Sequence, residues 1–179
     1  MKKLFALFLI VLLPLWAQSY NEHILKIEAN IIPRIILMDY KFKEKLVEGQ
    51  IAIAIVYDPI DLPHAKNIKK FFEEKYPKGI KGYPLNLTLV TYDSLHEKEH
   101  KVTLYYLMDS DPQTITKVIQ KSTRTHTLVF THDSQNLKYG AHVSLRIDKK
   151  IVPYLNPASL KKSGIVLRPA LLSISEFYQ

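Results

Sequence analysis

The sequence "HEKEH" at residues 96–100 contains residue types and a spacing that could bind zinc. His96, Glu97 and His100 match the H-E-x-x-H motif of zinc metalloproteases. In that motif two imidazoles lie one helical turn apart and bind one Zn²⁺, and the glutamate takes a proton from the metal-bound water. This chemistry requires an amphipathic helix packed against the domain and a third ligand from another element.

The surroundings of the motif do not supply that context. Residues 96–101 contain no apolar side chain, so a helix there would have no face to bury. The motif falls between two apolar segments, residues 85–92 and 101–108, which their pattern predicts as strands. We therefore expect a solvated connection between strands, with exposed histidines and no bound metal. A surface metal site made by His96 and His100 stays open as an alternative.

The rest of the chain gives little support for catalysis. Three histidines follow the motif without a recognisable ligand pattern: His126, His132 and His142. The chain contains no G-x-S-x-G, no G-x-G-x-x-G and no G-x-x-x-x-G-K. We expect no catalytic residue, no metal and no cofactor, and hence a protein that is not an enzyme.

His132 and Asp133 are candidates for a ligand-binding site. They stand at the end of an apolar segment, residues 125–132, which is predicted as a strand. Ligands of α/β proteins bind beyond the carboxyl ends of such strands. The alternative is that the two side chains cap the loop that follows.

Residues 1–19 have the pattern of a secretory signal peptide. Two lysines precede an unbroken apolar run at residues 4–13, and the small residues that follow suit cleavage after Ser19, or alternatively after Ala17. The apolar run is shorter than the ~20 residues of a membrane-spanning helix. We expect the leader to be removed on export and residues 20–179 to fold as one domain in the periplasm.

Charge and cysteine content agree with an exported protein that is held together by packing. The formal net charge is +8, and removal of Lys2 and Lys3 lowers it to +6. This excess favours acidic partners or anionic surfaces, whereas export argues against nucleic acid as a partner. The chain has no cysteine, so it cannot use disulfides.

Apolar strands alternate with amphipathic helices along the mature chain. Strands are predicted at residues 50–58, 85–92, 101–108 and 125–132, and a hairpin is predicted around Lys149-Lys150. Helices are predicted at residues 20–48 with a kink at Pro33, at 64–76, 112–121 and 157–164, and from near Pro169 to the end. The order predicts a single-domain α/β sandwich with a mixed sheet of about five to six strands and helices on both faces.

The mature chain resembles the YfiR-like family of periplasmic regulators. A strand "HTLVFTHD" is followed by "SQNLKYGAHVSLRID" and then by "KKIVPYLNPASLKKSGIVLRPALLSI". This order is similar to the tail of the family, and five residues match it: Asn156, Ala158, Gly164, Leu171 and Leu172. At the front, "KIEANIIPRIILMD" before "IAIAIVYDP" looks like the opening helix and first strand of the family.

The sequence departs from the family at three points. The family often has an aromatic-Pro end to its first helix, a Gly-Gly before the hairpin, and cysteines. Here the helix ends "MDYKFKEK", a single Gly140 stands before the hairpin, and cysteine is absent. Redox control through disulfides is therefore excluded for this chain.

The resemblance implies a non-enzymatic protein that binds the periplasmic domain of a membrane protein. Family members restrain a membrane-bound diguanylate cyclase, and so cyclic-di-GMP signalling, and they are often homodimers. Two alternatives stay open: a solute-binding module of transporter type, and a structural part of an envelope or motor machine.

An apolar partner-binding surface is expected in the tail of the chain. Its candidate residues are Leu155, Ile165, Leu167, Arg168, Leu171 and Leu172. Ordinary core packing is the alternative for the apolar members, since apolar residues are usually inside.

Overall fold

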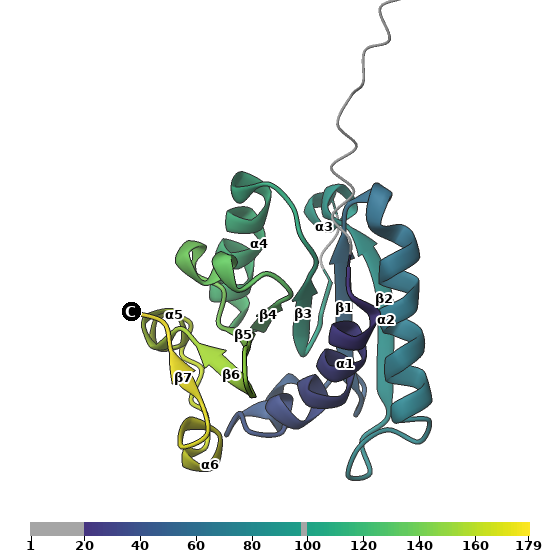
Figure 1. Ribbon diagram of the computed structural model, residues 1–179. Helices are drawn as coiled ribbons and strands as arrows, with labels where there is room; N and C mark the ends of the chain where they lie inside the picture. Colours follow the sequence, from purple (N-terminus) through teal and green to yellow (C-terminus); the bar gives the residue numbers. More distant parts are fainter. Residues whose placement is uncertain (1–19, 98–99) are drawn as a thin grey trace, which may run out of the picture.

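The computed structural model describes residues 20–97 and 100–179 (Figure 1). The expected signal peptide lies outside the described residues, as do Lys98 and Glu99 of the HEKEH sequence. Within the described part of the chain, the strands form one seven-stranded sheet. The strands are β1 (Ile51–Tyr57), β2 (Leu85–Thr91), β3 (Leu104–Leu107), β4 (Leu128–Thr131), β5 (Val143–Ile147), β6 (Ile151–Leu155) and β7 (Glu176–Phe177).

The sheet is mixed, and its strand order is β2-β1-β3-β4-β5-β6-β7. The strands β2, β1, β3, β4 and β5 are parallel, β6 is antiparallel to β5, and β7 is parallel to β6. This confirms the predicted α/β fold with a mixed sheet, with one strand more than the upper estimate. The order of the first five strands is that of a doubly wound, flavodoxin-like sheet.

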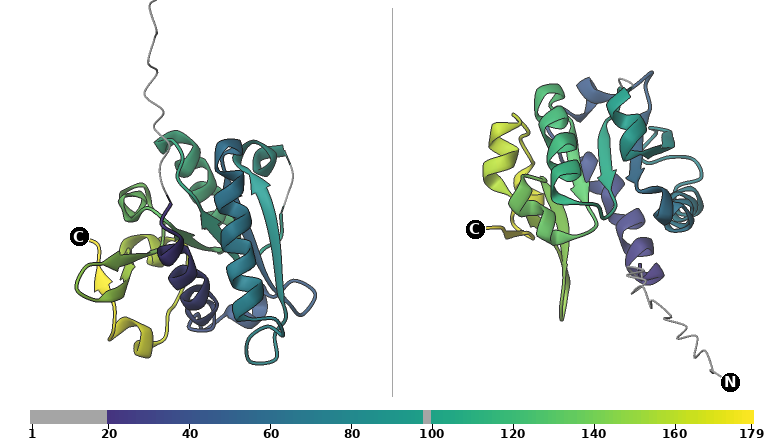
Figure 2. Two further views of the ribbon diagram at one scale, coloured as in Figure 1. Left: turned by 45° about the vertical axis from the view of Figure 1, so that its right-hand side comes forward. Right: turned by 90° about the horizontal axis from the view of Figure 1, so that it is seen from above.

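Helices cover both faces of the sheet. One face carries α1 (Glu22–Ile36) and α2 (Leu62–Lys75), which lie side by side in Figures 1 and 2. The other carries α3 (Tyr92–Glu97) and α4 (Pro112–Thr125). The remaining helices are α5 (Pro157–Lys162), α6 (Pro169–Leu172) and the 3-10 turns η1 (Phe42–Lys45), η2 (Pro59–Asp61) and η3 (Ser134–Tyr139).

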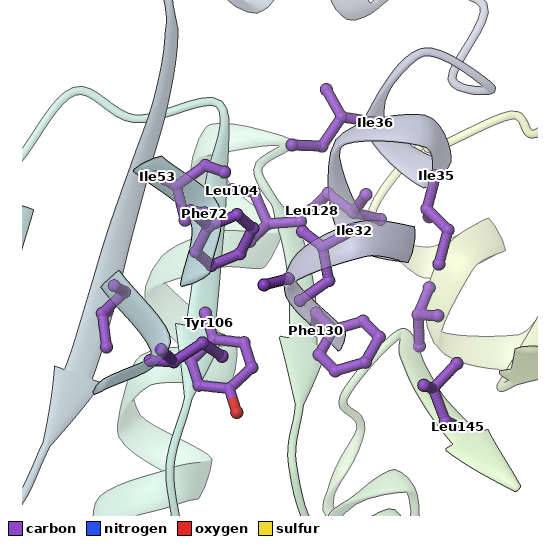
Figure 3. Packing of buried hydrophobic residues seen from close by; sticks show 14 of the residues in the cluster. Ile32, Ile35, Ile36, Ile53, Phe72, Leu104, Tyr106, Leu128, Phe130 and Leu145 are labelled. Atoms are coloured by element: carbon purple, nitrogen blue, oxygen red, sulfur yellow. The ribbon is translucent and has the colours of Figure 1, made fainter. Parts of the chain in front are cut away.

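The strand β1 contributes to both cores, because its side chains alternate between the two faces. Ile53 and Ile55 pack under α1 and α2, whereas Ala54 and Val56 pack under α3 and α4. All seven residues of β1 are buried, as its unbroken apolar sequence predicts. Figure 3 shows the first core, with Phe72 of α2 beside the strands.

The first helix differs in extent from the prediction. Pro33 lies inside α1, which continues to Ile36 and then ends, and the segment that follows forms η1. The helix begins at a capped end, because the side chain of Asn21 accepts a hydrogen bond from the backbone N–H of His23.

The end of the chain is not the predicted helix. The helix that begins at Pro169 lasts four residues, and the chain then forms β7 on the edge of β6. The hydroxyl of Ser175 donates to the carbonyl of Leu171 at 2.6 Å, so a side chain takes an acceptor that a further helical turn would use. The backbone N–H of Tyr178 instead donates to the carbonyl of Leu155 at 2.8 Å.

The predicted hairpin is confirmed as β5 and β6. Pro153 was expected to confine the second strand to an edge or a bulge, yet β6 has a neighbour on each side. The proline is tolerated because β7 pairs with Tyr154 and Leu155 only and leaves the position of Pro153 uncovered.

The HEKEH sequence does not lie on one continuous described helix. His96 and Glu97 end α3, which has six residues, and His100 follows in irregular structure. The side chains of His96 and Glu97 lie outside what the structure describes. His100 is half-buried rather than exposed, because its segment packs back toward β3, where its carbonyl accepts a hydrogen bond from Tyr105.

Across residues 20–97 and 100–179, none of the helices combines the length and the apolar composition that a membrane span needs.

Candidate functional site

A crevice is expected where the direction of strand addition reverses in an open α/β sheet. Here that point lies between β1 and β3. The connection from β1 runs through α2 on one face, and the connection from β3 runs through α4 on the other. The carboxyl ends of these strands, together with that of the neighbouring β4, lead into Asp58, Asp109 and His132.

Tyr20 fills this crevice. It is only 6% exposed. The phenol oxygen accepts a hydrogen bond from the backbone N–H of Asp109 at 3.0 Å and donates one to the carboxylate of Asp61 at 3.2 Å. The ring packs against two imidazoles, with centroid distances of 4.7 Å to His64 and 4.9 Å to His132.

Beneath Tyr20 lies a buried polar network. The Nδ1 atom of His132 lies 3.0 Å from both carboxylate oxygens of Glu28, and the hydroxyl of Tyr106 donates to the same carboxylate at 2.7 Å. Glu28 is 1% exposed, so its charge depends on these partners for stabilisation. The network joins α1 to the ends of β3 and β4.

The crevice shifts the proton affinity of several groups. Burial raises the pKa of the Asp109 carboxyl to about 6. Burial alone would lower the pKa of His132, but the hydrogen bond and negative charge of Glu28 outweigh it, so the pKa is raised. Burial also raises the pKa of the Tyr20 and Tyr106 hydroxyls, which stay protonated and act as hydrogen-bond donors.

An open hollow of about 460 Å³ borders the crevice. It has a polar side at the ends of β3 and β4 and an apolar side toward the hairpin. Its lining residues are Tyr20, Ile24, Asp109, His132, Asp133, Ser134, Leu145 and Ile147. The site is equipped to bind a molecule with an apolar body and a polar end.

The structure places both predicted ligand residues at this hollow. His132 is held by Glu28, and Asp133 caps η3 by accepting a hydrogen bond from the N–H of Gln135 at 2.8 Å. Asp133 therefore has the loop-capping role that was the alternative, while it also lines the hollow.

Two residues of the site are missing from the sequence-based candidates. Glu28 carries a signal that could have revealed it, because it shares the apolar face of α1 with Leu25 and Ile32, three and four residues away. A buried charge on such a face requires a partner. Tyr20 carries no such signal, since it lies before the helix begins.

The candidate partner residues of the tail separate into two groups. Four contribute to the core and are at most 5% exposed: Leu155, Ile165, Leu167 and Leu171. Arg168 and Leu172 reach the surface. Three apolar neighbours are more exposed than Leu172, with fractions of 54% for Val166, 62% for Ile174 and 48% for Phe177.

We call the exposed residues Val166, Arg168, Leu172, Ile174 and Phe177 the C-terminal surface. They lie on and around α6 and β7, at the yellow end of the chain in Figure 1. The guanidinium of Arg168 stacks over the ring of Tyr40 at 5.1 Å, so the surface combines apolar area with a held positive charge. A surface of this kind suits an acidic, partly apolar protein partner.

In the described part of the chain, no group of three or more His, Asp and Glu side chains has the arrangement of a metal site. The side chain of His96, the other expected ligand of a surface site with His100, lies outside the described residues.

Comparison with known proteins gives a family and a fold. The model of the YfiR/HmsC-like family matches residues 62–176. No curated protein matches the chain. A conserved domain protein from Vibrio cholerae is similar in structure, with a TM-score of 0.62, 15% identity, and coverage of 87% of this chain and 60% of that chain.

A second solved structure is the ABC domain in complex with L-Trp from Streptococcus pneumoniae. It has a TM-score of 0.55 and 11% identity, and the match covers 83% of this chain and 62% of that chain. At these identities the likeness concerns the fold alone. The chain thus spans about three fifths of the length of the solved chains that it resembles.

Proposed function

Because the chain belongs to the YfiR/HmsC-like family, we propose that it is an exported, non-enzymatic regulator that binds the periplasmic domain of a membrane protein. The partner that the family implies is a membrane diguanylate cyclase, which would place the protein in cyclic-di-GMP signalling and in the control of biofilm formation or motility. The mechanism is a shift of population, because a regulator that binds the inactive cyclase more tightly lowers the active fraction.

The observation that carries this proposal beyond the family is the C-terminal surface. Val166 and Ile174 are large apolar side chains that are more than half exposed, and they flank the positively charged Arg168 in the sequence. Interfaces bury apolar side chains at their centre and place charged groups around them. The buried Leu167 and Leu171 support this surface from beneath, because they anchor the segment to the core.

The test is capture of the cyclase by the purified protein. We expect the periplasmic domain of a membrane diguanylate cyclase from the same genome to bind the wild-type chain, and Val166→Asp and Ile174→Asp each to weaken binding about tenfold or more. Ile60→Asp is the matched control, since Ile60 is 77% exposed and lies on η2, outside the C-terminal surface.

Two results would contradict the proposal. One is a deletion strain whose cyclic-di-GMP level equals that of the wild type. The other is equal binding by the three aspartate variants, which would place the interface away from the C-terminal surface.

A second candidate function is capture of a small solute, and the hollow beside Tyr20 favours it. Ligands of open α/β sheets bind at such switch points. A library screen in which one compound raises the melting temperature of the wild-type chain, without any cyclase binding, would support this function over the first.

A further inference from the structure

The crevice between β1 and β3 is occupied by the chain itself. In open α/β sheets this is the place where a ligand binds beyond the strand ends. Here the phenol of Tyr20 has the contacts that a bound ligand would make: a backbone N–H at 3.0 Å, a carboxylate acceptor at 3.2 Å and two imidazole rings packed against it. Its ring is almost completely removed from water.

The crevice is fitted to a phenol rather than to any apolar group. The N–H of Asp109 donates to the phenol oxygen and the half-buried carboxylate of Asp61 accepts from it, and a phenol hydroxyl serves both partners. Other partners are already fixed: the hydroxyl of Tyr92 donates to the carbonyl of Met108, and His132 is held by Glu28. The polar end of the crevice thus pairs with one hydroxyl, and in the described part of the chain it also holds two buried polar atoms without a hydrogen-bond partner, His64 Nδ1 and Asp109 Oδ1.

The position of Tyr20 in the chain allows a free ligand to replace its ring in the crevice. It directly precedes Asn21, the N-cap of α1, so the ring is not part of a helix or a strand. The open hollow of about 460 Å³ reaches the ring from the side of Ile24 and Leu145. Movement of one residue would clear the crevice without unfolding α1.

We propose that the β1/β3 crevice is a binding site for a phenol-type ring, and that Tyr20 is its resident, tethered occupant. The tether holds the phenol at an effective concentration in the millimolar range or above, so a free ligand must exceed that level to replace it. Tyr20 thus acts as a latch on a ligand crevice. This inference does not depend on the identity of the protein partner.

The experiment is rescue of Tyr20→Ala by p-cresol, the free equivalent of the missing side chain. We expect the variant to melt about 10 °C below wild type, as for loss of a buried aromatic ring. A fragment of this size binds with a dissociation constant of about 1 mM, so 10 mM p-cresol should restore about 3–5 °C. Wild type should not respond, because its crevice is filled.

Two controls show whether the site is specific. Tyr76→Ala removes a half-buried tyrosine outside the crevice, whose hydroxyl donates to the carbonyl of Asn30 at 2.6 Å, and p-cresol should not restore its melting temperature. Toluene lacks the hydroxyl and should restore less of Tyr20→Ala than p-cresol does. Equal rescue of Tyr76→Ala, or equal rescue by toluene, would overturn the proposal.

A second variant keeps the proposal testable where Tyr20→Ala fails to fold. Tyr20→Phe retains the ring and removes the acceptor for the N–H of Asp109. Amide exchange at Asp109 should become about fivefold faster, the effect of one lost hydrogen bond. Exchange at Met108, whose N–H is held by Val56 at 2.9 Å, should not change. An unchanged rate at Asp109 would refute the role of Tyr20.

Discussion

The imidazole of His132 lies 3.0 Å from the carboxylate of Glu28, which precedes it by 104 residues in the chain. The contact joins the first helix to the end of the fourth strand beneath Tyr20. Glu28 is 1% exposed and the side chain of His132 is 16% exposed, so both groups interact in a medium that screens charge poorly. The pair therefore makes folding depend on proton binding by His132.

Stability should fall as pH rises from 6.5 to 8.5. The pKa of His132 is raised in the folded chain, so the contribution of the ion pair is complete below the ordinary histidine pKa near 6.5 and is lost as pH rises through the folded value. Melting temperatures measured across this range should decline for wild type and stay level for His132→Asn. His23→Asn, at an exposed site, should decline like wild type. A decline in His132→Asn equal to that of wild type would assign the effect to another group.

Removal of one partner of the pair should cost more than removal of a surface charge. Glu28→Ala leaves His132 and the hydroxyl of Tyr106 without their acceptor, and we expect a loss of about 3–5 kcal/mol in the free energy of unfolding. Urea unfolding of both single variants and of Glu28→Ala/His132→Ala should give a coupling energy of about 1–3 kcal/mol. Glu74→Ala, in an exposed pair with Lys70, should cost less than about 1 kcal/mol. A coupling near zero would contradict the ion pair.

Two glycines near β2 should respond differently to the same substitution. Gly79 and Gly82 both have positive φ angles, of 75° and 85°. A Cβ atom at Gly79 would collide with the backbone carbonyl of Tyr83, whereas a Cβ at Gly82 would meet nothing within 4 Å. Gly82→Ala should therefore cost only the left-handed backbone, about 1–2 kcal/mol, and Gly79→Ala clearly more. Equal losses in chemical denaturation would argue against this turn geometry.

The burial of the strands could be predicted from the sequence, but the sequence did not show which strands are neighbours in the sheet. The apolar, β-branched run of β1 indicates a strand that is covered on both faces, and all of its residues are buried. Its position between β2 and β3 creates the switch point, yet an apolar run gives no information on which strand pairs with it. The crevice therefore became visible only with the strand order.

The error in the tail has a physical cause. The spacing of Leu171 and Leu172 after Pro169 suits a helix, but the hydroxyl of Ser175 and the free edge of β6 offered the backbone other hydrogen bonds. In the candidate site, His132 was identified because it ends a strand. Its partner Glu28 lies 104 residues away in the chain, and the sequence does not show which residue of the fold pairs with it.

The buried His142 should make the protein sensitive to acid. Its Nδ1 accepts the N–H of Val129 at 2.9 Å and its Nε2 donates to the hydroxyl of Ser163 at 2.8 Å, so the folded chain requires a neutral imidazole. Burial lowers its pKa to about 3, and stability should therefore be lost as pH falls from about 6.5 toward 3, where the unfolded chain takes up the proton.

The substitution His142→Leu separates this proton effect from the loss of hydrogen bonds. It leaves the N–H of Val129 without its side-chain acceptor, which should cost about 2–4 kcal/mol at pH 7, and it removes the imidazole that the unfolded chain protonates. The stability of the variant should therefore fall less than that of wild type between pH 6.5 and pH 4.5 in urea unfolding. Ser163→Ala keeps the imidazole, so it should cost about 1 kcal/mol and keep the wild-type acid dependence. The same acid dependence in His142→Leu and in wild type would show that other groups govern acid unfolding.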